Sequence, residues 1–368
     1  MAGSSTSSWP TACLTSSGLE VIDFLVVVIP DLLDEAYEQL HTKGPEFEGW
    51  LSNHGPMAAD ALMRLGRGED VAGWLRGYVR RLEPMPEARW PISEAEWPGL
   101  LGDASRLGDW CALLTLQVRD EPWDAVLARW WPRLVTGMVA SSAHGLIRTG
   151  HAVRALREKV TPPRLAELGQ ALGYWAARWQ PVPGPAPNSG AADVGAALDA
   201  LPARGLTGGI RTRLASLDDD ATWPAALAAV APVADPFAVP AALDRLVDAA
   251  VTRYGRWGQA APVMLVHAAT APRAVALVIP ALPEQLWPGA FDAAWVVTAT
   301  IATIYRPRRL TVAADARAAT VDEVIERGVA TGDEHAIKFT EVAIESHRRG
   351  NALALASAAH AEAMIREE

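Results

Sequence analysis

Apolar residues recur every three or four positions along most of this chain, which is the period of an amphipathic α-helix. The clearest case follows Thr161, whose side chain suits the N-cap, and Pro162, whose fixed φ suits the first helical position. One face of that helix then carries an apolar stripe made of Leu165, Leu168, Leu172, Trp175 and Trp179. Similar periodicity predicts helices over 19–42, 70–82, 105–119, 121–140, 236–254, 284–305, 318–329, 334–348 and 350–366.

Strict alternation of apolar and polar residues, the pattern of a half-buried β-strand, is scarce. The sequence therefore predicts an all-α protein, a bundle-type unit of about 12 to 15 helices. Its clearest interruption is "PVPGPAPNSG", residues 181–190, because prolines and glycines at this density cannot continue a helix. This segment separates a tryptophan-rich half, 19–180, from an alanine-rich half, 191–368. We expect the two halves to pack around one central site as a single functional domain.

Charge and cysteine content narrow the class of protein. With 33 basic against 43 acidic residues and a net charge of −10, the chain lacks the footprint of a nucleic-acid-binding protein. Its two cysteines cannot build a disulfide framework, which fits a reducing cytosol. The apolar run "FLVVVI" is far too short to span a membrane. The first 18 residues are rich in Ser and Thr, lack the basic start of a secretory signal, and are expected to be poorly ordered. These features predict a cytoplasmic protein without a membrane partner.

Tryptophan is unusually abundant, with 15 residues against 5 Tyr and 5 Phe. The simplest interpretation is aromatic packing between helices. The alternative is that a few tryptophans line a pocket for a flat aromatic ligand.

The chain has 8 histidines, and they fall into two groups. His41 and His347 lie near predicted helix ends, where a partly cationic imidazole interacts well with the helix dipole, and His360 lies in an alanine-rich segment. We interpret these three as structural. Four of the remaining five lie beside apolar or small residues, which predicts burial; the five are His54, His144, His151, His267 and His335.

The pair His144 and His151 lies in "AHGLIRTGHAVRAL", each histidine beside a glycine. On an ideal helix the two side chains share one face but are separated by a rise of about 10.5 Å, too far for a straight helix to place both on one metal ion. Gly145 and Gly150 have high backbone freedom. Either the helix bends and both histidines bind one metal, or it stays regular and one histidine lies outside the site.

A buried imidazole needs a hydrogen-bond partner or a metal. Each of the five could be a satisfied core histidine, but five together point to a shared polar site, and imidazole suits Zn, Cu, Fe and Ni. Lys338 follows His335 by one helical turn on the same face. Beside buried histidines its charged form is disfavoured. Lys338 then loses its proton, is chemically altered, or snorkels to solvent and pairs with Glu334 or Glu341.

Several sequence blocks carry a family resemblance: "SNHGPMAADAL", "LGDW", "ARWWPRLVTGMVASSAHGLIRTGHAVRAL", "LGYWAARWQP", "VHAATAPRAV" and "DEHAIKFTE". In this order and spacing, over about residues 35–350, they resemble the questin oxidase-like family. Members of that family open a ring of anthraquinone-type aromatic polyketides by adding oxygen, and were first described as Baeyer–Villiger-type oxygenases. The resemblance implies an oxidoreductase of secondary metabolism, such as antibiotic biosynthesis, that acts on a small aromatic polyketide.

The resemblance also implies a non-haem iron held by histidines and, in one branch of the family, by a carboxylated lysine. Carried over by motif, the metal-binding candidates are His54, His144, His151, His267, His335 and Lys338, with Lys338 as the carbamate. Six ligands would fill an octahedral iron and leave no position for O2. One candidate should therefore lie outside the first coordination sphere, and we expect it to be His54 or one of His144 and His151.

Together these inferences predict an Fe(II)-dependent oxygenase, a monooxygenase or a dioxygenase, that uses O2. A carbamate on Lys338 needs a neutral amine and CO2, which a desolvated lysine can offer. Arg148 could stabilise a phenolate or a developing oxyanion, or form an ion pair at the helix surface. One alternative is a metal-independent Baeyer–Villiger-type monooxygenase that uses NADPH, although "GLTGGI" at 205–210 lacks the spacing of a dinucleotide motif. Another is a non-enzymatic helical ligand carrier. Both a monomer and a homodimer fit the sequence.

Overall fold

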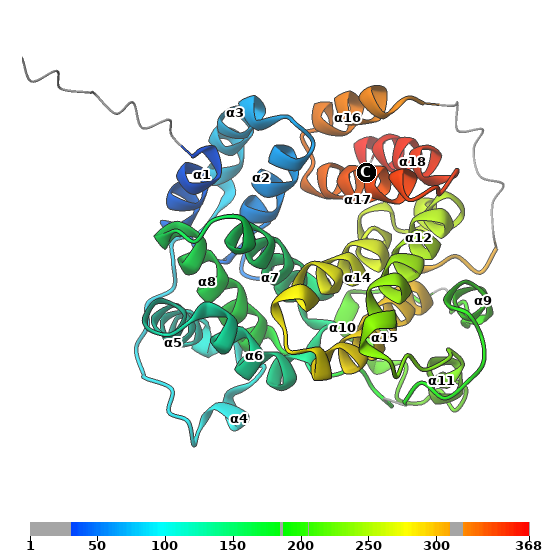
Figure 1. Cartoon of the computed structure of the whole chain (residues 1–368), viewed down its shortest axis with the longest axis horizontal. Helices are drawn as coiled ribbons and strands as arrows, with labels where there is room; N and C mark the ends of the chain where they lie inside the picture. Colours follow the sequence, from blue (N-terminus) through cyan, green and yellow to red (C-terminus); the bar gives the residue numbers. More distant parts are fainter. Residues whose placement is uncertain (1–30, 185–186, 205, 310–318, 368) are drawn as a thin grey trace, which may run out of the picture. The chain divides into compact units, whose positions relative to one another are not determined.

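The computed structural model describes residues 31–184, 187–204, 206–309 and 319–367. They belong to one compact unit, Asp31–Glu368. Within the described residues this unit is built from α-helices and one two-stranded sheet (Figure 1), so the all-α prediction is confirmed. The segment 1–18, expected to be poorly ordered, lies outside the described residues.

The first half of the unit contains a small hairpin between its first two helices. Strand β1 (Glu46–Phe47) pairs antiparallel with β2 (Leu51–Ser52). The helices of this half are α1 (Leu32–His41), α2 (Gly55–Arg64), α3 (Gly68–Tyr78), α4 (Trp97–Leu100), α5 (Leu107–Asp120), α6 (Trp123–Leu134), α7 (Ala140–Glu158) and α8 (Pro162–Arg178).

The second half begins with short helices and continues with long ones. They are α9 (Val194–Ala200), α10 (Ile210–Ala215), α11 (Trp223–Ala228), α12 (Val239–Trp257), α13 (Pro262–Leu265), α14 (His267–Val278), α15 (Trp287–Tyr305), α16 (Val321–Ala330), α17 (Glu334–Arg348) and α18 (Ala354–Glu367). Single 3₁₀ turns span Val79–Arg81, Ala104–Arg106, Val135–Gly137, Pro236–Ala238, Gly258–Ala260, Ile279–Ala281 and Glu284–Leu286.

The predicted helices are present wherever the structure describes the chain, and their punctuation follows the sequence. Thr161 caps α8 by accepting the backbone N–H of Arg164 at 3.4 Å, and Pro162 is its first residue. No helix spans the described residues of the segment 181–190. Helix α14 was not predicted, because its first residue, His267, was interpreted as the end of an apolar run. The short helices α9 to α11 also lacked a clear periodic signal.

Helix α7 packs against α8, α14 and α2 and so joins the two halves of the sequence. A Cβ on Gly145 would lie 2.7 Å from the Cα of Trp175 in α8, and one on Gly150 would lie 2.8 Å from the Cα of Ala274 in α14. These glycines therefore permit close approach of neighbouring helices rather than a bend. The non-helical residues of α7 are Ser141–Ala143, before both histidines, so of the two alternatives the regular helix is observed.

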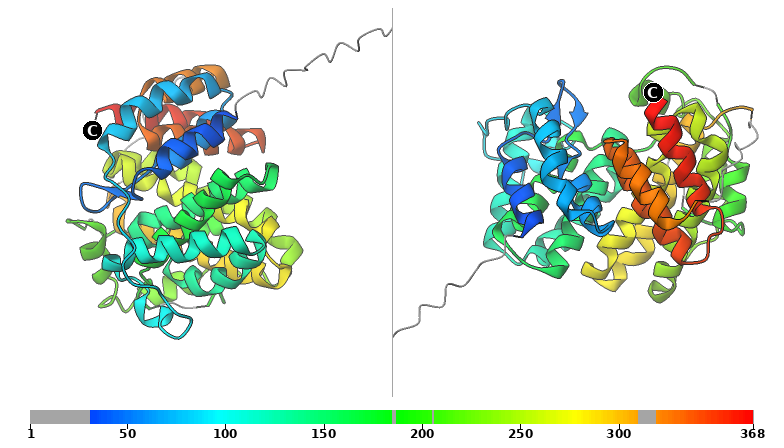
Figure 2. Two further views of the ribbon diagram at one scale, coloured as in Figure 1. Left: turned by 90° about the vertical axis from the view of Figure 1, so that its left-hand side faces the viewer. Right: turned by 90° about the horizontal axis from the view of Figure 1, so that it is seen from above.

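Helix α17 completes the contact between the halves. It packs against α2 although the two helices lie far apart in the sequence, and it also contacts α12, α14 and α18. Figure 2 shows α17, in orange-red, beside the blue α2 when the unit is seen from above. The helices α2, α7, α14 and α17 thus surround a common region.

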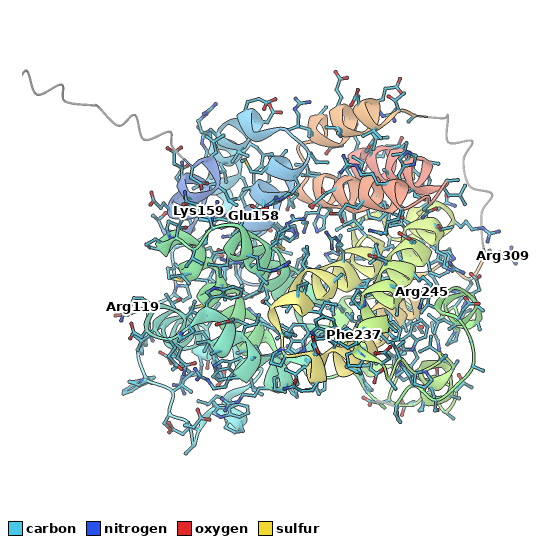
Figure 3. All side chains as sticks on the ribbon, viewed as in Figure 1. Arg119, Glu158, Lys159, Phe237, Arg245 and Arg309 are labelled. Carbon is cyan, nitrogen blue, oxygen red and sulfur yellow. The ribbon has the colours of Figure 1, made fainter. Side chains whose placement is uncertain are left out.

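Most tryptophans that the structure describes are packing residues. Trp110 meets Trp130 edge to face at 5.6 Å, and Trp131 meets Trp175 likewise at 5.8 Å, a favourable aromatic geometry. Side chains fill the space between the helices, whereas Arg119 lies at the periphery (Figure 3). The packing interpretation holds for these buried indoles.

One stretch of the described chain, Pro262–Ala281, is long and apolar enough to cross a membrane. Of its most apolar window, 72% is buried against the rest of the protein. It also carries the buried His267 and packs, through α14, on α7, α12 and α15. This is the environment of a core helix.

Candidate metal centre

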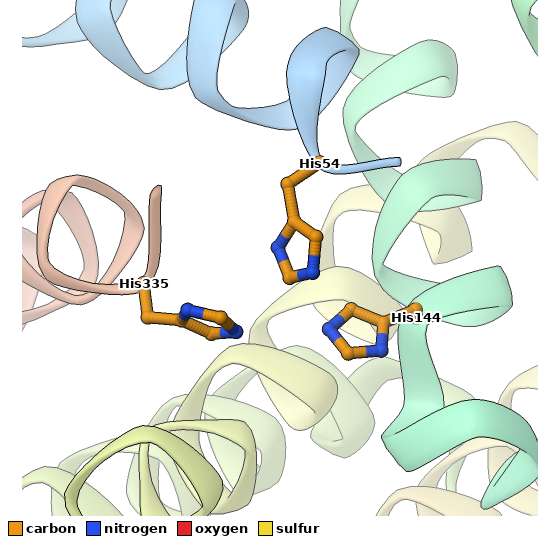
Figure 4. A group of neighbouring side chains, drawn as sticks. All are labelled: His54, His144 and His335. Atoms are coloured by element: carbon orange, nitrogen blue, oxygen red, sulfur yellow. The ribbon is translucent and has the colours of Figure 1, made fainter. Parts of the chain in front are cut away.

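Four of the five candidate histidines converge from four different helices. His54 is the N-cap residue of α2, His267 is the first residue of α14, and His335 lies in the first turn of α17. His144 follows the non-helical residues of α7. Three of these rings point into one space in Figure 4, which draws His54, His144 and His335. A nitrogen from each of the three lies within 4.8 Å of a nitrogen from the others.

The ring distances join His267 to this group. Ring centroids are 4.3 Å apart for His54 and His144, and 4.5 Å apart for His54 and His335. His267 lies 4.6 Å from His144 and 5.2 Å from His335 by the same measure. All four residues are at most 9% exposed. We call His54, His144, His267 and His335 the histidine cluster.

A strained backbone turn places His144 in the cluster. Ser141, Ser142 and Ala143 have φ values of 45°, 60° and 67°, the left-handed region that residues with a Cβ avoid by about 1–2 kcal/mol each. The turn brings the Ser141 carbonyl to the Nδ1 of His144, with which it forms a short hydrogen bond. Strain of this kind is characteristic of functional sites, where the surrounding structure maintains it.

The hydrogen-bonding contacts of His144 and His267 require one more proton than two neutral rings supply. His144 Nδ1 faces the Ser141 carbonyl, His267 Nδ1 faces the Met264 carbonyl at 3.1 Å, and the two Nε2 atoms face each other at 2.9 Å. A carbonyl only accepts, and a neutral imidazole has one N–H. Two neutral rings therefore supply two protons for three contacts. If both protons serve the carbonyls, two bare nitrogen lone pairs meet at 2.9 Å.

A metal ion resolves this conflict. Two nitrogen ligands at right angles, each about 2.1 Å from a metal, lie about 3.0 Å apart, close to the observed 2.9 Å. Carbonyl partners on Nδ1 are also the usual way in which a protein fixes the tautomer of a metal-binding histidine. The alternative, an imidazolium in the third contact, is opposed by burial. Burial and then the charge of His267 or His335 hold the pKa of His144 and His267 well below its usual range.

The other two members of the cluster also have polar neighbours. The backbone N–H of His54 donates to the Tyr78 hydroxyl at 2.6 Å, and burial holds the pKa of the His54 ring well below its usual range. Asp333 caps α17 and lies 3.3 Å from the Nδ1 of His335. Although burial raises the pKa of Asp333, its interactions with His335 lower that pKa to about 2, so the carboxylate is ionised at neutral pH.

Lys338 adjoins the cluster. Its side chain is 1% exposed, and its Nζ lies 2.9 Å from the Nδ1 of His54. The snorkelling interpretation is therefore wrong, and Glu341 is instead paired with Arg154. Burial lowers the pKa of Lys338 to about 8. The neutral amine that carboxylation requires is therefore more accessible than in an exposed lysine.

His151 lies outside the cluster. Two turns along α7 from His144, it contacts Asp60 Oδ2 through its Nδ1 at 2.8 Å and lies beside Arg154. His54, by contrast, touches two other histidines, so of the alternatives named for the outlying candidate the structure favours His151 over His54. The structure brings together five of the six candidates and leaves His151 as a neighbour.

Arg148 is buried rather than at the helix surface. Its Nε and Nη2 bind Glu167 at 2.5 and 2.7 Å, and Nη2 also reaches Gln170 at 3.2 Å. Its Nη1 is buried without a hydrogen-bond partner in the described residues. Of the two alternatives for Arg148, the ion pair is therefore observed, but it lies in the core rather than at the helix surface. Arg148 follows His144 on α7 by one helical turn, and its ion pair holds the guanidinium against α8.

The acidic partners of these side chains were not predicted from the sequence. Asp60 and Glu167 are fully buried, in the apolar stretches "MAADALM" and "LAEL". A lone carboxylate at a core-facing helical position signals a buried partner, and that signal was available. The three histidines interpreted as structural stand apart from the cluster; His41, for example, ends α1 and contacts Glu167 at 3.0 Å.

No model of a known protein family matches this chain, and no curated protein matches it. The resemblance to the questin oxidase-like family therefore depends on the sequence blocks alone. What it implies about iron, oxygen and substrate is taken up as a proposal below.

Proposed function

We propose that the protein is a cytoplasmic non-haem Fe(II)-dependent oxygenase that uses O2 to cleave or oxidise a ring of an anthraquinone-like aromatic polyketide. The observation that carries the metal is the pair of facing Nε2 atoms of His144 and His267, 2.9 Å apart and each backed by a carbonyl. The choice of iron and of an aromatic polyketide comes from the family resemblance.

The donor set fits a redox metal with an open position. The four imidazoles of the histidine cluster are neutral ligands of the kind that Fe(II) accepts. Lys338 would add one negative oxygen as a carbamate. In that reaction the Nζ lone pair of the neutral amine forms a bond to the carbon of CO2, one C=O π bond opens to give the negative oxygen, and one N–H proton is released. Five such donors would leave room at the metal for one small ligand. When bound, iron supplies the activation of O2 that a protein side chain cannot provide.

Arg148 is the candidate for holding the substrate. Glu167 fixes two of its nitrogens, and the remaining Nη1 can donate to a phenolate or to an oxyanion that develops during the reaction. A guanidinium stays charged at any working pH, so it favours the ionised and more electron-rich form of a phenol. Because the arginine is buried, this interaction takes place at low dielectric, where it is stronger than in water.

The first test is the metal content of protein purified without oxygen. We expect about one iron per chain in the wild type, strongly reduced iron in His335→Ala and Lys338→Ala, and unchanged iron in the control His360→Ala. O2 uptake with a panel of hydroxylated anthraquinones, and ¹⁸O₂ incorporation into the product, then test the oxygenase activity. A signal from ¹³CO₂ that Lys338→Ala abolishes tests the carbamate.

Two results would redirect the assignment. A metal-free wild type that consumes NADPH and oxygenates the same compounds would establish the metal-independent monooxygenase. Among the described residues the element that directly precedes 208–210 is the helix α9 rather than a β-strand, so this alternative lacks the context of a dinucleotide site. A metal-free protein that binds anthraquinones without turnover would establish the carrier. Gel filtration or light scattering would distinguish the monomer from the homodimer.

A further inference from the structure

A buried charge network links the three helices that carry His54, His144 and the pair His335 and Lys338. Asp60 comes from α2, Arg154 from α7, and Glu341 from α17. Arg154 Nη2 and Nε donate to Asp60 Oδ2 at 2.5 and 3.0 Å, and Arg154 Nη1 donates to Glu341 Oε1. One guanidinium therefore connects all three helices.

The network is deeply buried. The side chains of Asp60, Arg154 and Glu341 are 0%, 11% and 6% exposed. Charge-assisted hydrogen bonds of a planar guanidinium have restricted directions, so they fix both the distance between the helices and their rotation. His151 adds a fourth contact, to the same Asp60 oxygen that Arg154 binds.

The fourth helix of the cluster is tied in separately. Arg273 on α14, six residues after His267, donates to Glu345 on α17 at 2.7 Å. His267 and His335 are thereby linked through their helices, as His54, His144 and His335 are linked through Arg154. Each cluster helix is joined to at least one other by an ion pair.

The network also lies next to Lys338, which adjoins the histidine cluster. His151, Arg154, Arg273 and Glu341 line a small cavity of about 10 Å³, and Lys338 forms another part of its wall. This volume corresponds to a single water molecule. The charged groups are therefore close to Lys338 rather than in a separate part of the core.

Stability alone does not account for this arrangement. A buried ion-pair triad is often no more stabilising than apolar residues of the same volume, because desolvation offsets the attraction. Apolar side chains of the same volume fill the space but do not fix the relative orientation of the helices. A metal site benefits from a fixed orientation, because its donors must be held near the ligand geometry before the ion arrives.

We infer that Arg154 is a positioning residue of the metal centre, which sets the relative placement of α2, α7 and α17 so that the histidine cluster is preorganised for the ion. This inference depends on the metal centre of the proposed function. Removal of partners that hydrogen-bond metal ligands directly typically weakens metal affinity 10–100-fold. Arg154 acts through the helices rather than on a ligand, so we expect a loss near the lower end of this range when it is replaced.

The test compares Arg154→Met with Arg164→Met. Arg164 is also a buried arginine with two carboxylate partners, Asp31 and Asp34, and belongs to α8, which carries no cluster histidine. Both variants should unfold at lower temperature than the wild type when free of metal. Only Arg154→Met should weaken Fe(II) binding at least 10-fold in anaerobic titration and change the ligand-field absorption of bound Co(II). Arg154→Lys should restore part of the affinity.

Glu341→Gln is a milder variant that keeps the Arg154–Asp60 pair and weakens the tie to α17. If Arg154→Met does not fold, this variant carries the test, with a smaller loss of affinity and a changed Co(II) spectrum expected. Equal affinities and spectra in the Arg154, Glu341 and Arg164 variants would overturn the inference while leaving the metal centre intact. A wild type that binds neither Fe(II) nor Co(II) would refute the metal centre, and the inference with it.

Discussion

Replacing His267 by leucine tests the proton count that underlies the proposed metal centre. In the metal-free protein the Nε2 atoms of His144 and His267 face each other at 2.9 Å, and both are bare when each ring's proton serves its carbonyl. Leucine removes one of them and retains a buried side chain of similar size. It also removes the hydrogen bond from His267 Nδ1 to the Met264 carbonyl.

The two effects can be weighed against each other. An unsatisfied buried polar group costs about 1–3 kcal/mol, and a hydrogen bond contributes about 0.5–1.5 kcal/mol. We therefore expect the metal-free variant to range from about 2.5 kcal/mol more stable to about 0.5 kcal/mol less stable than the wild type. Metal reverses the order, because an ion at about 1,000 times its Kd stabilises the wild type by about 4.1 kcal/mol. The variant should lose most of that stabilisation.

The assay is urea unfolding followed by tryptophan fluorescence, under argon, with chelator or with Fe(II). His360→Leu is the control, because His360 lies in α18 and contacts the Tyr254 ring rather than the cluster. It should change stability equally in both conditions. A metal-free His267→Leu protein destabilised by more than about 3 kcal/mol, the upper cost of disrupting a satisfied buried polar group, would refute the proton count. A wild type with the same free energy of unfolding with and without Fe(II) would also refute the reasoning.

Three further predictions concern the surrounding fold. Gly145→Ala places a Cβ 2.7 Å from the α8 backbone and should lower the free energy of unfolding by about 1–3 kcal/mol. In the control Gly73→Ala the new Cβ meets only the end of an arginine side chain at 3.7 Å, so this variant should raise the free energy of unfolding by about 0.5–1 kcal/mol. Burial raises the pKa of Glu362 to about 7, so this carboxyl binds a proton in the folded state that the unfolded state releases above about pH 4.5. Stability should therefore fall between pH 4.5 and 7, and Glu362→Gln should reduce that fall in unfolding curves. Arg148→Met removes the arginine partner of the buried Glu167, which then keeps only its contact with His41 among those named above, and should lose about 3–5 kcal/mol. The double variant with Glu167→Leu should regain most of this stability in thermal unfolding but not turnover, and recovery of both would show that Arg148 has no role at the substrate.

The helices could be predicted from the sequence because their signals are local. The stripe from Leu165 to Trp179, with Thr161 and Pro162 before it, contains everything needed to start and orient α8. The break at Ser141–Ala143 could not be predicted in the same way, because none of its residues prefers the left-handed region. Tertiary packing overrides local preference there. The role of Gly145 and Gly150 stayed open for a related reason, since their partners, Trp175 and Ala274, are distant in the sequence.

The site was only partly accessible from the sequence. Residue type and burial pattern singled out the five histidines and Lys338, but the choice among them depends on which helices meet. His151 shares a face of α7 with His144, and only the position of Asp60 shows that it turns to a carboxylate. The partners Asp60, Arg154 and Glu341 are separated by 94 and 187 residues along the chain, so no local pattern connects them.

The placement of His151 bears directly on the proposed chemistry. An octahedral ion with six protein ligands has no position for O2, so an oxygenase assignment would conflict with six converging donors. The regular helix after Ala143 separates His144 from His151 by two turns, a rise of about 10.5 Å, and both cannot bind one ion. Four histidines and Lys338 remain, drawn from both halves of the sequence, and they leave one position open. Gly145 and Gly150 let α8 and α14 pack closely on this regular helix, so the packing of the fold and the proposed number of ligands are linked through α7.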